Sequence, residues 1–234
     1  MIKAVFFDWF NTLAHYDPPR EALVQQALQE LGYSIPLKAV SQGLYLADKQ
    51  YYEEGPRVSH GERAQEERAR LYMRTQQTLL RAIEITPTDD LTARLVMRTR
   101  ELMSRMRFVL YDDVLPALKV VRELGLTTGL LTNLQREVDS ACRQLGISQY
   151  LDFAVTSLEV GADKPQPPIF LRALELARAK PEEAVHVGDQ YRNDVLGARG
   201  VGIKGLLIDR SDLNADVTDC PRLRSLTEIT RHLE

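Results

Sequence analysis

Five short apolar runs, each rich in Val, Ile or Leu and bounded by turn residues, constrain the fold of this chain more than any other feature. The runs occupy residues 2–7, 127–131, 153–156, 184–187 and 205–208. Their length and composition are typical of buried parallel strands. Helical patterns accompany them in the C-terminal half, at residues 114–124, 136–145, 169–179 and 194–199. This alternation of strand and helix predicts an α/β fold built on a parallel sheet.

Residues 17–107 have a different character, because Ala, Leu, Gln, Glu and Arg dominate them and no apolar strand run occurs. Turn-forming residues interrupt this segment at residues 32–36, 54–56 and 86–88. The interruptions predict roughly four helices. We therefore expect a helical domain at residues 17–107, inserted into an α/β core domain formed by residues 1–16 and 108–234.

The composition of the 234 residues argues against several classes of protein. A formal net charge of −3 disfavours a dedicated nucleic-acid binder, because phosphate affinity needs an excess of Lys and Arg. Cys142 and Cys220 lie far apart and indicate neither a disulfide framework nor a zinc site. The first apolar stretch ends at Asp8, too early for a signal peptide, and no run reaches about 18 apolar residues. We therefore expect a cytoplasmic protein with no membrane or nucleic-acid partner.

Acidic residues come after two of the predicted strands. Asp8 immediately follows the first run, and Asp189 and Asp194 come after the fourth. In open α/β sheets, ligands bind at the carboxyl ends of the strands. A carboxylate beside a buried strand needs a partner, and two acids together suit a hard cation such as Mg²⁺. The plain structural interpretation remains open, since strands often end in a structural Asp and acids also favour helix N-termini.

Three further polar residues follow predicted strands or precede predicted helices. Thr132 and Asn133 come after the second run, where they either bind phosphate oxygens or cap a helix. Lys164 lies in a proline-rich loop before a helical pattern, where it either neutralises a phosphate and a nucleophile or faces water. Taken alone, none of these residues separates a functional site from an ordinary loop.

Four elements occur in this order along the chain: Asp8, the Thr132-Asn133 pair, Lys164, and Asp189 with Asp194. In order and spacing, they together resemble the four motifs of the haloacid dehalogenase-like (HAD) hydrolase superfamily. Residues 111–116, with Leu118 and the Leu124-Gly125 pair, and residues 197–202 are also similar to the family, so the resemblance covers nearly the whole chain. It implies a Rossmann-like core with a parallel sheet. It also implies that the helical insertion after the first motif is a cap of the C1 type.

The resemblance assigns roles to the candidate residues. It implies that Asp8 is the nucleophile of an aspartyl intermediate and that Lys164 orients Asp8 and offsets charge. Thr132 and Asn133 would hold the transferred group, and the substrate would be a small phosphorylated molecule. It further implies a Mg²⁺ cofactor held by Asp8, the backbone carbonyl of Phe10, Asp189 and Asp194. These roles are physically coherent, because a carboxylate attacks phosphorus only where cations screen the repulsion between two anions.

One residue departs from the phosphatase pattern of the family. Phosphatases carry a second Asp two residues after the nucleophile, as the acid for the leaving group and then the base for water, whereas this chain has Phe10. Phenylalanine cannot carry a proton, and general acid–base help is typically worth about 10²- to 10⁴-fold in rate. The departure predicts a handicap in hydrolysing ordinary phosphate monoesters.

Three functions are compatible with Phe10. The first is Mg²⁺-dependent phosphoryl hydrolysis or transfer in which the leaving group needs no acid, or in which His15, a cap residue or the substrate supplies the proton. The second is 2-haloacid dehalogenation, since those enzymes have an aromatic Tyr at this position. They use no Mg²⁺, however, and usually carry Ser in place of Asp189, and they place an Arg in the early cap, where this chain has none between Arg20 and Arg57. The third is a catalytically weak or inactive protein that binds a ligand.

Overall fold

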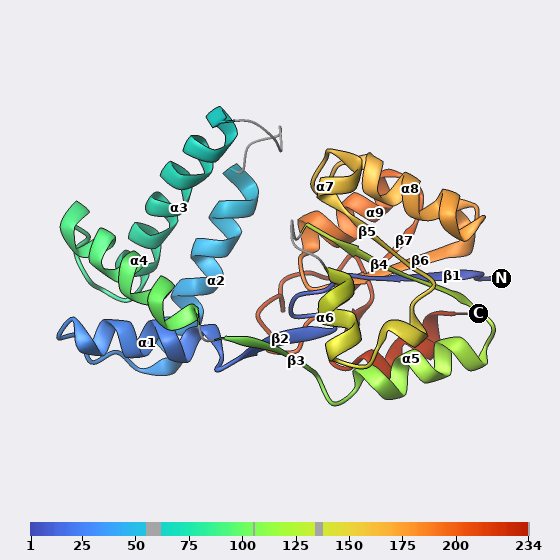
Figure 1. The fold of residues 1–234 in the computed structure, drawn as a ribbon, viewed down its shortest axis with the longest axis horizontal. Coiled ribbons are helices and arrows are strands. Elements are labelled where there is room, and N and C mark those ends of the chain that lie inside the picture. Colours follow the sequence, from blue (N-terminus) through green and yellow to red (C-terminus); the bar gives the residue numbers. More distant parts are fainter. Residues whose placement is uncertain (55–61, 105, 134–137, 234) are drawn as a thin grey trace. The chain divides into compact units, whose positions relative to one another are not determined.

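The computed structural model describes residues 1–54, 62–104, 106–133 and 138–233. The chain forms two compact units, one of Met1–His15 with Phe108–Glu234 and one of Tyr16–Arg107 (Figure 1). Parts of two predicted features lie outside the described residues, namely positions 136 and 137 of a predicted helix and positions 55 and 56 of a predicted turn.

The first unit contains a six-stranded parallel sheet with the order β5-β4-β1-β6-β7-β8. The strands are β1 (Ala4–Phe7), β4 (Thr127–Thr132), β5 (Phe153–Thr156), β6 (Ala184–Gly188), β7 (Lys204–Ile208) and β8 (Arg222–Leu223). All five apolar runs form strands of this sheet, and the predicted α/β class is confirmed. Strand β1 lies between β4 and β6, with Phe7 in register with Leu130 and Val187. The carboxyl ends of these three strands therefore meet at one edge.

Helices cover both faces of the sheet (Figure 1). They are α5 (Val114–Glu123), α6 (Val138–Gln144), α7 (Ser157–Val160), α8 (Pro167–Ala177) and α9 (Gly197–Gly200), and the same unit has 3₁₀-helices η1 (Ser148–Tyr150), η2 (Pro181–Glu183) and η4 (Leu226–His232). Each face of the sheet packs against its helices in a separate apolar cluster, and strand β1 contributes side chains to both. Val5 and Phe7 belong to the cluster that includes α5, and Ala4 and Phe6 belong to the cluster that includes α8. This alternation follows from the two-residue period of a strand and explains why every residue of β1 is apolar.

Two local features differ from the sequence-based prediction. The expected helix at residues 194–199 begins as a π-helix, η3 (Tyr191–Leu196), before it continues as α9. A separate two-stranded sheet, β2 (Ala14–Asp17) with β3 (Arg107–Leu110), was not predicted. Each of its strands has only four residues, and β2 has one fully buried position, so no apolar alternation marks it.

The second unit contains the helices α1 (Arg20–Glu30), α2 (Leu37–Glu54), α3 (Glu62–Ala82) and α4 (Asp89–Met103), which is the predicted number within the part of the unit that is described. Their apolar faces form one core that includes Leu28, Leu79 and Leu95. Thr88 caps α4 by accepting a hydrogen bond from the Leu91 amide at 3.1 Å, which explains the turn signal at residues 86–88. Among the described residues, none of the helices is both long and apolar enough to span a bilayer.

Candidate active site

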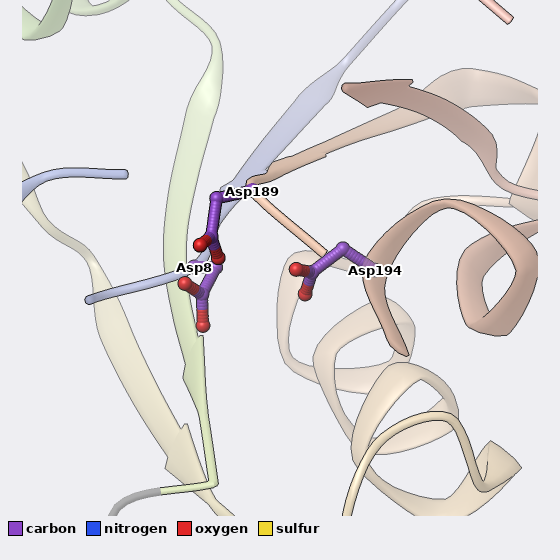
Figure 2. A group of neighbouring side chains, drawn as sticks. All are labelled: Asp8, Asp189 and Asp194. Carbon is purple, nitrogen blue, oxygen red and sulfur yellow. The ribbon is translucent and has the colours of Figure 1, made fainter. Parts of the chain in front are cut away.

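Three carboxylates converge at the carboxyl edge of the sheet (Figure 2). Asp8 follows β1, Asp189 follows β6, and Asp194 lies in η3. One oxygen from each carboxylate lies within 4.8 Å of the others. Because β1 and β6 are hydrogen-bonded neighbours, the Asp8 amide donates to the Val187 carbonyl at 2.8 Å, and this contact places the first and last motifs side by side. The structure therefore brings together the three acidic residues that the sequence singled out.

Lys164 is buried among these carboxylates. Its ammonium group donates to Asp8 Oδ1 and to Asp194 Oδ1, both at 2.6 Å, and to the Leu131 carbonyl at 3.0 Å. The side chain is only 2% exposed, which excludes the interpretation that Lys164 faces water. All three ammonium protons have acceptors, so the lysine is held in a single position beside Asp8.

Asp194 is the most constrained of the three acids. His186 Nε2 lies 3.0 Å from Asp194 Oδ1, and the Gln190 amide donates to Oδ2 at 3.0 Å. A Cβ atom on Gly188 would lie 2.1 Å from the carboxylate carbon, so only glycine fits at the end of β6. Burial alone would raise the pKa of Asp194, but the charge of Lys164 and the hydrogen bond from His186 outweigh it and hold this pKa below its usual value.

At Asp8 and Asp189, the neighbouring hydrogen-bond donors do not outweigh the effect of burial on the pKa. Burial, reinforced by the charge of Asp194 and opposed by Lys164, raises the pKa of Asp8 to about 6. Burial and the charges of Asp8 and Asp194 raise the pKa of Asp189 well above its usual value. Asp189 Oδ2 accepts from Asn11 Nδ2 at 3.2 Å, whereas the buried Oδ1 has no hydrogen-bond partner within the described part of the chain. Lys164 therefore neutralises only part of the negative charge, and the oxygen-rich site fits a hard divalent cation.

Thr132 is the last residue of β4 and Asn133 follows it, so both lie at the same edge, and Thr132 is buried. Asn133 makes contacts that the sequence did not predict. Its Oδ1 accepts from the Lys164 amide at 2.8 Å and its Nδ2 donates to the Lys164 carbonyl at 3.2 Å. Both ends of the amide are thus engaged by the main chain of Lys164, and Asn133 positions the loop that delivers the lysine.

The turn after Asp8, residues 9–14, is called the Asp8 loop here. Thr12 Oγ1 donates to Asp8 Oδ2 at 3.3 Å, and Asn11 reaches Asp189 from a left-handed backbone conformation with φ of 58°. The side chain of Phe10 is partly buried and packs against the apolar cluster that includes α5. The sequence assigned no site role to Asn11 or Thr12, so their contacts with the carboxylates emerge from the structure.

Two histidines near the site have distinct positions. His186 is fully buried in β6 and contacts Asp194, a role that the sequence analysis missed. The signal that could have identified it is a polar residue inside an otherwise apolar strand, two residues before Gly188. His15, which the sequence left as an alternative proton donor, packs on the ring of Tyr111 with centroids 4.5 Å apart.

Comparison with known proteins identifies relatives over most of the chain. A family model described as haloacid dehalogenase-like hydrolase matches residues 2–202. Ribulose-1,5-bisphosphate 5-phosphatase from Halopiger xanaduensis is 32% identical over 228 residues, which cover 94% of this chain and 89% of that protein. Haloacid dehalogenase-like hydrolase domain-containing protein 3 from Danio rerio is 35% identical over 128 residues, so the match spans about half of the length of that relative (53%).

A solved structure shows the same fold. The HAD family hydrolase from Deinococcus radiodurans, with bound phosphate and sodium, has a TM-score of 0.69 over 99% of this chain and 95% of that chain, at 16% identity. The family model covers more than half of the sequence, and the phosphatase from Halopiger matches nearly its full length. This chain therefore belongs to the haloacid dehalogenase-like hydrolase family.

Proposed function

We propose that this protein is a Mg²⁺-dependent hydrolase of small phosphorylated molecules that acts through an aspartyl intermediate on Asp8. The observation that carries the proposal is a cluster of three carboxylates, of which Asp8 and Asp194 are buried and contact Lys164, while Asp189 is partly buried and its Oδ1 has no hydrogen-bond partner among the described residues. Such a site gains a large free energy from a divalent cation. The relative from Halopiger carries a phosphatase name, which supports a phosphorylated substrate.

Each residue has a role in this proposal. Mg²⁺ would be held by Asp8, Asp189, Asp194 and the Phe10 carbonyl, and it would supply positive charge to the phosphoryl oxygens. A carboxylate oxygen of Asp8 forms a bond to phosphorus while the bond from phosphorus to the leaving oxygen breaks. Water then attacks the aspartyl phosphate, so that inorganic phosphate leaves and Asp8 is regenerated. Lys164 keeps Asp8 ionised and aligned, and Thr132 and Asn133 would hold the transferred group.

Phe10 narrows the substrate class. Because its side chain donates no proton, the first step favours a leaving group that departs as a stable anion, as acetate leaves acetyl phosphate. For other substrates, His15, the substrate itself or the helical unit Tyr16–Arg107 would have to supply the proton. We assign this unit as a C1-type cap on the basis of its four helices and its insertion after the first motif.

The proposal is tested by measuring phosphate release from acetyl phosphate and from p-nitrophenyl phosphate, with Mg²⁺ and with a chelator. We expect acetyl phosphate to be the better substrate and chelation to lower its turnover by about 10²-fold or more, since the cation contributes several kcal/mol to transition-state stabilisation. Adding Mg²⁺ back in excess of the chelator should restore the rate. Turnover that is unchanged in chelator would contradict a metal-dependent reaction.

A second candidate function is 2-haloacid dehalogenation, which the aromatic side chain of Phe10 favours. The carboxylate of Asp189 opposes it, because a further negative charge beside Asp8 has no use in a metal-free displacement of halide. Halide release from 2-chloropropionate, without phosphate release from either phosphorylated compound, would support this candidate. Absence of both activities in a folded protein that still binds phosphate would support a ligand-binding role.

Replacing Phe10 with aspartate tests the reason given for the substrate preference. We expect Phe10→Asp to raise kcat/KM for phenyl phosphate by about 10²-fold, because the phenolate leaving group needs the proton that the new carboxyl group supplies. The kcat/KM for acetyl phosphate should change much less, because acetate leaves without a proton and this ratio does not include the later attack of water on the aspartyl phosphate. Phe10→Asn is the matched control, since it loses the same packing against the apolar cluster of α5 without gaining a titratable group. Equal rates for the two folded variants would refute the explanation.

A further inference from the structure

Arg210, which follows β7 and belongs to none of the four motifs, contacts the main chain of the Asp8 loop. Its Nη2 donates to the Thr12 carbonyl at 2.8 Å, and its Nε donates to the Asn11 carbonyl at 3.3 Å. The side chain is 16% exposed. A guanidinium group presents its donors in a rigid plane, so two carbonyls bound to one plane are fixed relative to each other.

The two residues that Arg210 binds are also those whose side chains reach the carboxylates. Asn11 donates to Asp189 at 3.2 Å, and Thr12 donates to Asp8 at 3.3 Å. The loop is tightly wound, since the amides of Leu13 and Ala14 both donate to the Trp9 carbonyl, at 2.9 and 3.0 Å. A shift of the main chain at Asn11 and Thr12 would therefore move the hydrogen bonds of two of the three clustered acids.

Contacts with residues outside the Asp8 loop hold the guanidinium group of Arg210 in place. Asp113 accepts Nη1 at 2.8 Å and Nη2 at 3.0 Å, and the ring of Tyr111 lies 3.8 Å from the guanidinium carbon. Asp113 also accepts from the Ser225 hydroxyl and from the Leu226 amide, both at 2.8 Å. Burial alone would raise the pKa of Asp113, but the hydrogen bonds from Arg210, Leu226 and Ser225 lower it, so the carboxylate stays ionised opposite Arg210.

We propose that Arg210, held by Asp113 and Tyr111, is a positioning residue that sets the Asp8 loop and thereby the alignment of Asp8 and Asp189. This inference gives a role to the segment at residues 111–116, which resembled the family without an assigned function. Its catalytic consequence rests on the proposed phosphatase activity, whereas its effect on the loop and on cation binding does not. Residues of this kind, which orient the groups that touch a metal, typically alter affinity or activity by about 10- to 100-fold.

The test compares Arg210→Met with Arg222→Met. Methionine keeps an apolar chain on Tyr111 but donates no hydrogen bond. Arg222 is a matched control in the same unit, because it is 24% exposed, donates to the Asn214 carbonyl at 2.6 Å and pairs with Asp212 at 3.3 Å. Arg222 also pairs with Asp209 at 3.7 Å, and in the part of the chain that the structure describes these contacts do not involve the Asp8 loop.

We expect Arg210→Met to weaken Mg²⁺ binding, measured by titration calorimetry, and to lower kcat for acetyl phosphate, each by about 10-fold or more. KM should change little, because the loop carries no substrate contact in the proposal. Amide hydrogen exchange at Leu13 and Ala14 should accelerate in this variant. Arg222→Met should remain within about two-fold of wild type in all of these measurements, even if both variants lose similar thermal stability.

Two outcomes would overturn the inference. If both variants melt at similarly lower temperatures while Mg²⁺ affinity and exchange at Leu13 and Ala14 stay unchanged, Arg210 is only a structural ion pair. If exchange accelerates in Arg222→Met as much as in Arg210→Met, the effect is not specific to the Asp8 loop. Failure of the proposed function has a different signature, since wild type would then hydrolyse neither phosphorylated compound while the exchange comparison still tests the loop.

Discussion

Asp8→Asn is expected to abolish hydrolysis of acetyl phosphate, with kcat falling by about 10⁴-fold or more, as expected when a covalent nucleophile is removed. An amide has nearly the shape of a carboxylate, but it is not nucleophilic and carries no negative charge. The measurement is phosphate release at saturating Mg²⁺. A folded variant that keeps more than about a tenth of the wild-type turnover would show that Asp8 is not the nucleophile.

The stability of the same variant separates lost chemistry from lost folding. The pKa of Asp8 is raised to about 6 by burial and by Asp194, above its usual 3.8. A carboxyl group with a raised pKa in the folded state contributes stability that is present at low pH and lost as the pH rises from about 4 to 6. Asparagine is uncharged throughout this range. In chelator at pH 7, Asp8→Asn should therefore melt at or above the wild-type temperature, and its melting temperature should depend less on pH.

A matched control for this substitution lies at the opposite edge of the sheet. Asp152 precedes β5 and accepts a hydrogen bond from the Thr128 amide at 2.7 Å, far along the strands from the carboxylate cluster. Asp152→Asn retains an acceptor oxygen for that bond. It should leave kcat within about two-fold of wild type, and a large loss there would show that Asp-to-Asn changes in this unit act through general destabilisation.

Lys164→Met is expected to produce the second large effect, on both rate and stability. Removing the ammonium group leaves Asp8 and Asp194 buried without the charge that contacts both of them. Breaking a buried ion pair by deleting one partner costs about 3–5 kcal/mol, so urea unfolding in chelator should show a loss of that order. The kcat at saturating Mg²⁺ should fall by about 10²- to 10³-fold, the usual cost of losing one preorganised charged donor.

The folding stability of Lys164→Met should change with pH in a definite direction. Without Lys164, burial and mutual repulsion favour the protonated forms of Asp8 and Asp194. The folded pKa of Asp8 then rises further above its unfolded value, and the folded pKa of Asp194 loses the lowering that the charge of Lys164 produces. The stability lost at pH 7 should therefore be partly recovered as the pH is lowered to 5. Lys204→Met is the control, since that lysine is the exposed first residue of β7, at the edge of the sheet opposite the carboxylates, and donates to the His232 carbonyl at 3.1 Å. Equal effects of the two substitutions would refute the role of Lys164.

Much of the fold follows from local patterns in the sequence. The apolar runs form five strands because a strand buried on both faces must be apolar at every position, as β1 is. The helices of residues 17–107 begin and end near the predicted interruptions because proline, glycine and capping residues act on their own neighbours, as Thr88 does on α4. The convergence of Asp8 and Asp189 also follows from the sequence, since parallel strands present their carboxyl ends at one edge.

Other features depend on contacts between residues far apart in the chain. The sequence left Lys164 either in the site or in water, and its burial between Asp8 and Asp194 decides between them. The sequence also did not predict that the side-chain amide of Asn133 binds the main chain of Lys164, about thirty residues later in the chain. No local pattern selects between such partners, because each polar group finds its acceptor only after the loops have packed.

The sequence by itself determined the α/β class, the helical insertion, the order of the acidic residues and the absence of a carboxyl group at position 10. These are properties of composition and spacing, which act through local backbone preference and burial. Only the tertiary structure decided which charges are compensated, that Asn11 and Thr12 reach Asp189 and Asp8, and that Arg210 binds their carbonyls. Hydrogen bonds and charge interactions act over a few ångströms, so they are settled by which distant segments the folded core brings into contact.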